Sequence, residues 1–141
     1  FLMEPGFQPI PTAEGWQLSN APIFSMTPLL ASLELFSAAG MKNLHSKGER
    51  LSGYLEYIVD EINKELAESL EIITPREKSQ RGCQLSIVAH GRGKELFDKL
   101  TDRGVIADWR EPNVIRMAPV PMYNSFEDIF DFGIILKESL K

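Results

Sequence analysis

One arginine, Arg116, lies in an otherwise apolar and proline-rich segment, NVIRMAPVPMYNSFED, which runs from Asn113 to Asp128. An arginine side chain stays protonated at working pH, so where it is buried it must meet an acceptor group or remain hydrated. Its planar guanidinium is well suited to binding a carboxylate through two parallel hydrogen bonds. Two interpretations follow, an internal salt bridge with an acidic residue of the chain or a bond to a ligand carboxylate. The spacing alone favours the internal salt bridge.

The neighbours of Arg116 predict that it lies on a β-strand. Val114, Ile115 and Met117 are apolar, and two prolines follow at positions 119 and 121. Because proline has no amide donor, we expect this strand to lie at a sheet edge or to leave the sheet near Pro119. From either position the guanidinium could project into a cleft at the end of the sheet.

Other polar residues favour simpler interpretations. Ser19 and Asn20 precede an apolar helix, which is typical of a helix cap. His45 and His90 share no metal-ligand spacing and are predicted to be surface residues. Cys83 alternates with apolar residues and is predicted to be a small buried side chain. As the single cysteine, it also excludes an internal disulfide and a multi-cysteine metal site.

Composition predicts one folded domain or lobe. The chain has 141 residues, of which 43% are hydrophobic and 25% are charged. A net charge of -5, a sequence pI near 5.1 and interleaved charges argue against nucleic-acid and anionic-membrane partners. No apolar run approaches the roughly 20 residues of a membrane span, so we expect a cytoplasmic protein with no membrane partner.

Helices and strands are expected to alternate along the chain. A buried helix is predicted to end on Gly40, with Pro28 at its start or at a kink. Ser125 and Asp128 have capping-box spacing at the start of the last helix. The fold class is therefore α+β, a small and mostly antiparallel sheet with helices on one face. The predicted helices span residues 21–40, 41–69, 93–104 and 125–141, and the strands lie within 70–75, 82–90, 105–112 and 114–121.

The opening of the chain differs from the rest. Prolines at positions 5, 9 and 11 precede any helical period and favour extended or turn conformations. We interpret residues 1–14 as an interlobe linker or entry segment and residues 15–141 as one C-terminal domain. We expect the chain to be the C-terminal part of a longer protein.

Four segments together carry a resemblance to a known family: GWQLSNAPI, ASLELF, RGCQLSI and DRGVIADWREPNVIRMAPVPMYNSFEDIFDF. They resemble the C-terminal small domain of kynureninases, pyridoxal-phosphate enzymes of the aspartate-aminotransferase fold type. The resemblance covers the chain from about Gly15 onward. It implies hydrolysis of L-kynurenine, or of 3-hydroxykynurenine, to anthranilate, or 3-hydroxyanthranilate, and L-alanine in tryptophan catabolism and NAD biosynthesis.

The resemblance also implies roles for three residues. Arg116 matches the family's arginine before APVP and is implied to bind the α-carboxylate of the substrate, which reverses the preference for an internal salt bridge. Asn20 matches the asparagine of the family's SNPPI motif and is implied to hydrogen-bond the aromatic-ketone end, with Ser19 beside it. Here the motif reads SNAPI, so Ala21 replaces a proline while the amide stays in place.

The family's pyridoxal-phosphate site is implied to lie in a large domain upstream of Phe1. The Schiff-base lysine, the aspartate that pairs with the pyridinium nitrogen and the phosphate-binding groups would all belong to that domain. We therefore expect these residues alone neither to hold the cofactor nor to turn over substrate. The implied partners are the protein's own large domain and a second copy in a homodimer. The alternative is a non-catalytic carboxylate-binding or dimerisation module.

Overall fold

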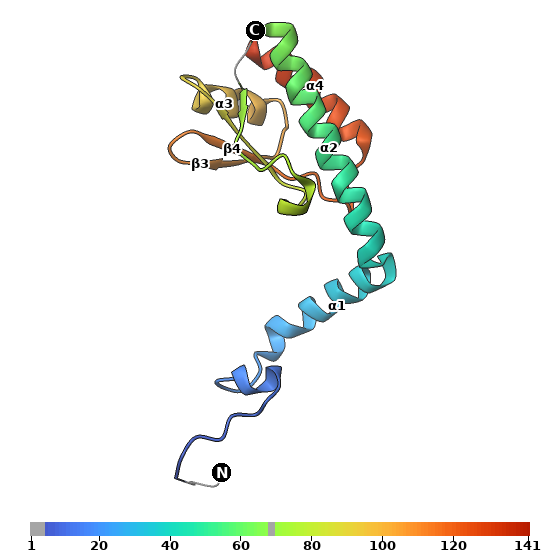
Figure 1. Cartoon of the computed structure of the whole chain (residues 1–141), viewed down its shortest axis with the longest axis vertical. Helices are drawn as coiled ribbons and strands as arrows, with labels where there is room; N and C mark the ends of the chain where they lie inside the picture. Colours follow the sequence, from blue (N-terminus) through green and yellow to red (C-terminus); the bar gives the residue numbers. More distant parts are fainter. Residues whose placement is uncertain (1–4, 68–69) are drawn as a thin grey trace. The chain divides into compact units, whose positions relative to one another are not determined.

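The computed structural model describes residues 5–67 and 70–141 of the chain (Figure 1). The chain divides into two units, Phe1–Ala38 and Ala39–Lys141. The boundary predicted after residue 14 stays a prediction.

The first unit contains a short 3-10 helix, η1 (Ala13–Trp16), and nearly all of α1 (Ile23–Ala39). Pro28 lies inside α1, so the alternative in which it starts the helix is wrong. The helix ends directly before Gly40, whose φ of 80° favours glycine, as predicted. The apolar side chains of α1 point in all directions around its axis, a pattern typical of helices that are buried on every side. In this unit they are exposed: Ile23, Phe24, Met26, Leu29, Leu30, Leu33, Leu35 and Phe36.

The second unit is built on a four-stranded antiparallel sheet with strand order β1-β2-β4-β3, which confirms the predicted α+β class. The strands are β1 (Leu70–Ile72), β2 (Leu85–Ala89), β3 (Asp108–Arg110) and β4 (Val114–Met117). The prediction that the Arg116 strand lies at a sheet edge is wrong, because β4 pairs with β2 on one side and β3 on the other. The other predicted alternative, that the strand leaves the sheet near Pro119, is confirmed. The strand ends at Met117, so Pro119 removes no hydrogen bond from the sheet.

The described residues of this unit also form three α-helices, α2 (Met41–Leu66), α3 (Gly93–Asp102) and α4 (Phe126–Leu140), and one short 3-10 helix, η2 (Lys78–Gln80). Helices α2 and α4 run side by side in Figure 1, and α2 and α3 both contact the sheet. The predicted end of the long helix at residues 68–69 lies outside the described residues. Within the described ranges no single helix is long and apolar enough to cross a membrane, and α1 and α2 meet such a criterion only when taken together.

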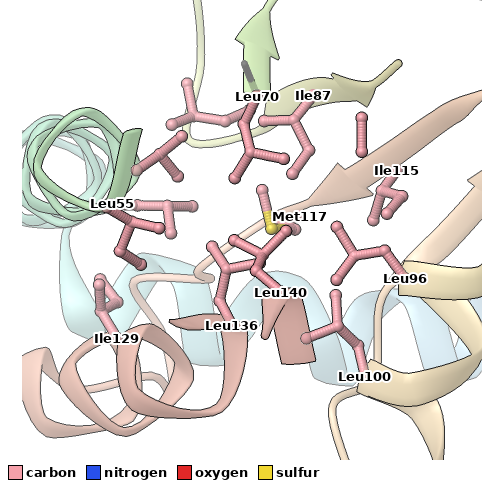
Figure 2. Packing of buried hydrophobic residues seen from close by; sticks show 14 of the residues in the cluster. Leu55, Leu70, Ile87, Leu96, Leu100, Ile115, Met117, Ile129, Leu136 and Leu140 are labelled. Carbon is pink, nitrogen blue, oxygen red and sulfur yellow. The ribbon is translucent and has the colours of Figure 1, made fainter. Parts of the chain in front are cut away.

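The hydrophobic core lies between these helices and one face of the sheet. Figure 2 shows side chains of α2, α3 and α4 meeting those of the strands around Met117. Burying this much apolar surface is the dominant favourable term in folding. The core cluster comprises Leu51, Leu55, Val59, Ile62, Leu70, Leu85, Ile87, Ala89, Leu96, Leu100, Ile115, Met117, Ile129, Leu136 and Leu140.

Side-chain hydrogen bonds fix the turn that follows β4. Lys47 of α2 donates from Nζ to the carbonyl oxygen of Pro121 at 2.8 Å. The amide of Val120 donates to Oδ1 of Asn124, also at 2.8 Å. Ser125 and Asp128 form the predicted capping box, with each backbone amide donating to the other residue's side chain. The exit from β4 is therefore tied both to α2 and to the first turn of α4.

An ion-pair network joins α2 to the segment before β2. Arg81 is only 3% exposed and donates from Nη2 to Glu56, which is 18% exposed. Arg76 donates to Glu56 at 2.7 Å and to both carboxylate oxygens of Asp60 at 2.7 and 3.0 Å. Burial acts to raise the pKa of Glu56, but hydrogen bonds from the two arginines outweigh it and hold that pKa below its ordinary value. Glu56 is therefore ionised at neutral pH.

We expect two helical glycines to respond oppositely to alanine. A Cβ on Gly133 of α4 would lie 2.7 Å from Cγ2 of Ile58, whereas a Cβ on Gly53 of α2 would meet no atom within 4 Å. The β-branched Ile58 has little rotamer freedom to move away. Gly133→Ala should lower the free energy of unfolding by about 1–3 kcal/mol, and Gly53→Ala should raise it by up to about 1 kcal/mol. Urea denaturation measures both, and stabilisation by Gly133→Ala would contradict the close packing of α4 on α2.

We expect Glu56→Gln to lower the free energy of unfolding by about 3 kcal/mol, because it leaves the buried Arg81 guanidinium without a counter-charge. Glu61→Gln is the matched control on the same helix, since among the described residues Glu61 pairs only with the exposed Lys64. It should change the free energy by less than about 1 kcal/mol. Equal effects of the two substitutions in urea denaturation would show that the buried pair contributes no more than a surface pair.

Candidate carboxylate-binding site

Arg116 lies on the face of the sheet opposite the hydrophobic core. Successive side chains of a strand point to opposite faces, and its neighbours Ile115 and Met117 are both buried in the core. The Arg116 side chain is 32% exposed. The alternation of β4 therefore carries an arginine out of the apolar core without interrupting the strand.

The sheet register sets the neighbours of Arg116 on this face. Asp108 of β3 is directly opposite Arg116 on one side, and Ser86 of β2 is directly opposite on the other. Side chains opposite each other in an antiparallel pair have Cβ atoms roughly 5 Å apart, within reach of an ion pair. Because Ser86 is small and Asp108 is charged, the guanidinium finds its protein partner on the β3 side.

A single carboxylate oxygen holds Arg116. Nε of Arg116 donates to Oδ2 of Asp108 at 2.6 Å, and Nη2 donates to the same oxygen. Nε of Arg110 lies 3.0 Å from that oxygen as well. The internal ion pair expected from spacing alone therefore exists. Two guanidiniums share one carboxylate, and this three-residue cluster keeps a net positive charge.

The cluster lowers the pKa of Asp108. The largest cause is the hydrogen bond from Arg116, which together with the charges of Arg110 and Arg116 outweighs a smaller opposing effect of desolvation. The carboxylate is therefore ionised at neutral pH. Its contribution to stability is present above the ordinary aspartate pKa of about 3.9 and is lost as the pH falls through the lowered pKa.

The contact with Asp108 uses only one edge of the Arg116 guanidinium. A guanidinium has five N–H donors, and the side-on edge consists of Nε–H and one hydrogen of Nη2. Within residues 5–67 and 70–141 no hydrogen bond or ion pair is seen from Nη1. The end-on edge, formed by one hydrogen of Nη1 and the second hydrogen of Nη2, is therefore engaged in no hydrogen bond or ion pair within the described part of the chain. That edge is able to accept a carboxylate bidentately.

The Arg116 side chain is half-exposed on its face of the sheet. Two hollows of the second unit lie elsewhere, one of about 740 Å³ and one of about 450 Å³. Arg116 lines neither, although its neighbour Met117 reaches the smaller one. The described residues also contain no group of three metal-ligating side chains. The chemistry available on this face is therefore carboxylate recognition rather than metal binding.

A family profile and three similar proteins all carry the name kynureninase. The profile of the Kynureninase C-terminal domain matches residues 44–136. The chain is 57% identical over 140 residues to the kynureninase of Christiangramia forsetii, 53% over 140 residues to that of Flavobacterium johnsoniae, and 53% over 135 residues to that of Xanthomonas euvesicatoria. These matches cover 99%, 99% and 94% of this chain.

The chain belongs to the kynureninase family. This confirms the family predicted from the sequence motifs. The matches cover 33%, 33% and 31% of those relatives, so the chain spans about a third of the length of the curated kynureninases it matches.

Ser19 and Asn20 lie in an exposed bend before α1. They belong to the first unit and Arg116 to the second, so each is placed only within its own unit. Within residues 5–67 neither side chain makes a hydrogen bond that caps α1, and the amides of Ser25 and Met26 in the first turn of the helix donate to the carbonyl of Pro22. The helix-cap interpretation is therefore not supported, and the substrate-binding role implied by the kynureninase motif stays a prediction.

Three further sequence predictions have mixed outcomes. His45 and His90 are exposed, as expected of surface residues, and pair with Glu49 and Glu71. Cys83 was predicted to be buried in a strand, but it is half-buried and β2 begins only at Leu85. The reason is that the apolar alternation extends two residues beyond the sheet hydrogen bonds.

The lysines of this chain do not fit a pyridoxal-phosphate site. Every lysine lies within the described residues and none is buried. Lys64, Lys94, Lys99 and Lys137 pair with carboxylates at the surface, and Lys47 binds the Pro121 carbonyl. A lysine that holds a cofactor as a Schiff base works from a desolvated pocket. The described residues provide no such lysine.

Sequence reasoning missed Asp108 and Arg110. The segment DWREP was predicted to be strand and surface, and nothing in its spacing identifies Asp108 as the partner of an arginine eight residues later. The register of the predicted hairpin, however, could have identified the pair. Two strands joined by the turn at Glu111, Pro112 and Asn113 form an antiparallel hairpin, whose register pairs Asp108 with Arg116.

We expect Arg116→Gln to raise the pKa of Asp108 toward about 3.9, because it removes the hydrogen bond that is the main cause of the lowered pKa. Arg110→Gln is the matched control at the same oxygen. It should raise the pKa of Asp108 less, since Arg110 acts mainly through its charge. NMR titration of the Asp108 carboxyl carbon measures both changes. A larger effect of Arg110→Gln would mean that Arg110, not Arg116, is the principal partner.

Proposed function

We propose that this chain is the C-terminal domain of a kynureninase that hydrolyses L-kynurenine, or 3-hydroxykynurenine, to anthranilate, or 3-hydroxyanthranilate, and L-alanine. Arg116 binds the α-carboxylate of the substrate. The observation that carries this proposal is the end-on edge of the half-exposed Arg116 guanidinium, where Nη1 makes no hydrogen bond or ion pair within the described part of the chain. Membership of the kynureninase family supports it.

The charge of the site suits a carboxylate ligand. Arg110 and Arg116 together outweigh Asp108, so an incoming carboxylate meets a net positive charge. A hydrogen bond to a charged group contributes on the order of 1.5–3 kcal/mol, and a bidentate pair exceeds a single bond. Fixing the carboxylate also fixes the orientation of the amino acid, which is how a binding residue raises the rate of a reaction at another atom.

Asn20 and Ser19 are proposed to contact the other end of the substrate. The amide of Asn20 has both donor and acceptor atoms and would hydrogen-bond the aromatic-ketone group, with Ser19 beside it. Both side chains are exposed and engaged in no hydrogen bond among residues 5–67, which leaves them available to a ligand. Their role rests on the SNAPI motif and on family membership.

Pyridoxal phosphate is proposed to be held by a domain preceding this chain, because the lysines here do not fit that role. When bound, this cofactor withdraws electrons from the substrate's α-carbon. The chain's own share is to bind and orient the substrate. A homodimer in the cytoplasm is the form proposed for the full-length protein.

We expect Arg116→Ala in the full-length, cofactor-loaded protein to lower kcat/KM for L-kynurenine by roughly ten- to a thousandfold, because each 1.4 kcal/mol of lost binding in the transition state is about tenfold. Anthranilate fluorescence measures the rate. Arg103→Ala is the matched control, since Arg103 is an exposed arginine that pairs with Glu138 away from the site. It should leave kcat/KM within about twofold.

Two outcomes would contradict the proposal in different ways. A loss below threefold for a folded Arg116→Ala protein would return Arg116 to a purely structural ion pair with Asp108. The absence of anthranilate from a folded, cofactor-loaded wild-type protein would reject the reaction itself. The non-catalytic carboxylate-binding module would then be the better description of the chain.

A further inference from the structure

We propose that Asp108 is a positioning residue for Arg116. It accepts hydrogen bonds from the side-on edge of the guanidinium and thereby orients the end-on edge toward the substrate carboxylate. This inference rests on the proposed function of Arg116. It assigns to the internal ion pair a role in substrate recognition. Figure 1 shows β3 and β4, the two strands that carry the pair.

The geometry of the pair separates the two edges of the guanidinium. Nε and Nη2 of Arg116 both donate to Oδ2 of Asp108, and Nη1 makes no hydrogen bond or ion pair within the described part of the chain. A carboxylate that occupied the end-on edge would instead bond to Nη1 and Nη2. The substrate and Asp108 can therefore bind the same guanidinium at once.

Holding the guanidinium in advance lowers the entropy lost on binding. A free arginine side chain loses rotamer entropy when it is fixed. Asp108 already fixes it in the folded protein, from a position set by the backbone pairing of β3 with β4. Because Asp108 lies on a paired strand and not on a loop, the direction of the Arg116 side chain follows from the sheet register.

Arg110 prevents Asp108 from neutralising the site. An isolated Arg116–Asp108 pair would have no net charge and would attract a second carboxylate only weakly. Nε of Arg110 lies 3.0 Å from Oδ2 of Asp108, so the cluster as a whole stays cationic. The same two arginines lower the pKa of Asp108, through the hydrogen bond from Arg116 first and then through their charges.

If Asp108 instead competes with the substrate, its removal changes substrate binding in the opposite direction. If Asp108 occupied the place of the substrate carboxylate, it would compete with substrate, and its removal would strengthen binding. The contact through Nε argues against this role, because a competing group would take the end-on edge. The sign of the effect on KM therefore separates positioning from competition.

The test uses the full-length, cofactor-loaded enzyme with Asp108→Asn, which keeps the size of the side chain and removes its charge. We expect kcat/KM for L-kynurenine to fall about tenfold, mainly through a higher KM, because a misdirected guanidinium binds the carboxylate less well. Glu111→Gln is the matched control. Glu111 is an exposed carboxylate beside β3 that accepts from Trp109, and its substitution should leave kcat/KM unchanged.

A second ligand separates positioning from a general structural effect. The decarboxylated analogue of L-kynurenine keeps the amine and the aryl ketone but has no α-carboxylate. Asp108→Asn should leave its inhibition constant within twofold, whereas a distorted site would bind both ligands more weakly. In an Arg116→Ala background, Asp108→Asn should lower kcat/KM by less than a further twofold, since the group that it positions is gone.

The outcomes distinguish this inference from the proposed function. If Arg116→Ala lowers kcat/KM and Asp108→Asn does not, Asp108 has no positioning role and the proposed function stands. If Asp108→Asn lowers KM, Asp108 competes with substrate and the inference is overturned. Equal losses for L-kynurenine and the decarboxylated analogue would also overturn it. If Arg116→Ala itself has no effect, the proposed function fails and this inference fails with it.

Discussion

The alternation of side chains along β4 is the constraint on which the rest of the site depends. Ile115 and Met117 are buried against the helices, which requires the residue between them to face the other way. A slip of one residue in the register would place a charged Arg116 in the core, at a far greater free-energy cost than any surface contact could offset. The packing of the core therefore fixes both the direction of Arg116 and its partner across the sheet.

The elements of the fold were largely predictable because their signals are local. The apolar period of α2, the capping-box spacing at Ser125 and the glycine after α1 each act within a few residues. The order of the strands was not predictable from such signals. Two prolines favoured an edge position for β4, yet Pro119 lies just past the last paired residue, and the strand is interior. Proline is excluded only from strand positions whose backbone amide must donate a hydrogen bond to a neighbouring strand.

The candidate site was half predictable. The family motif singles out Arg116, and the chemistry of its guanidinium predicts a carboxylate as its ligand. The motif did not reveal that one carboxylate already belongs to the chain, because Asp108 reaches Arg116 only through the hairpin register. Reasoning from spacing treated the internal ion pair and the ligand as alternatives. The two edges of one guanidinium allow both, and this follows from atomic positions rather than from residue types.

The ion-pair network of Glu56, Arg76 and the buried Arg81 side chain has a consequence for behaviour on warming. Removing charged groups from water becomes less unfavourable as the temperature rises, while the stabilisation from buried apolar area levels off. The attachment of α2 to the segment before β2, which depends on these charges, therefore weakens less on heating than contacts made by apolar side chains alone. The share of this ion-pair network in the stability of the second unit, relative to that of the apolar core, therefore grows as the temperature rises.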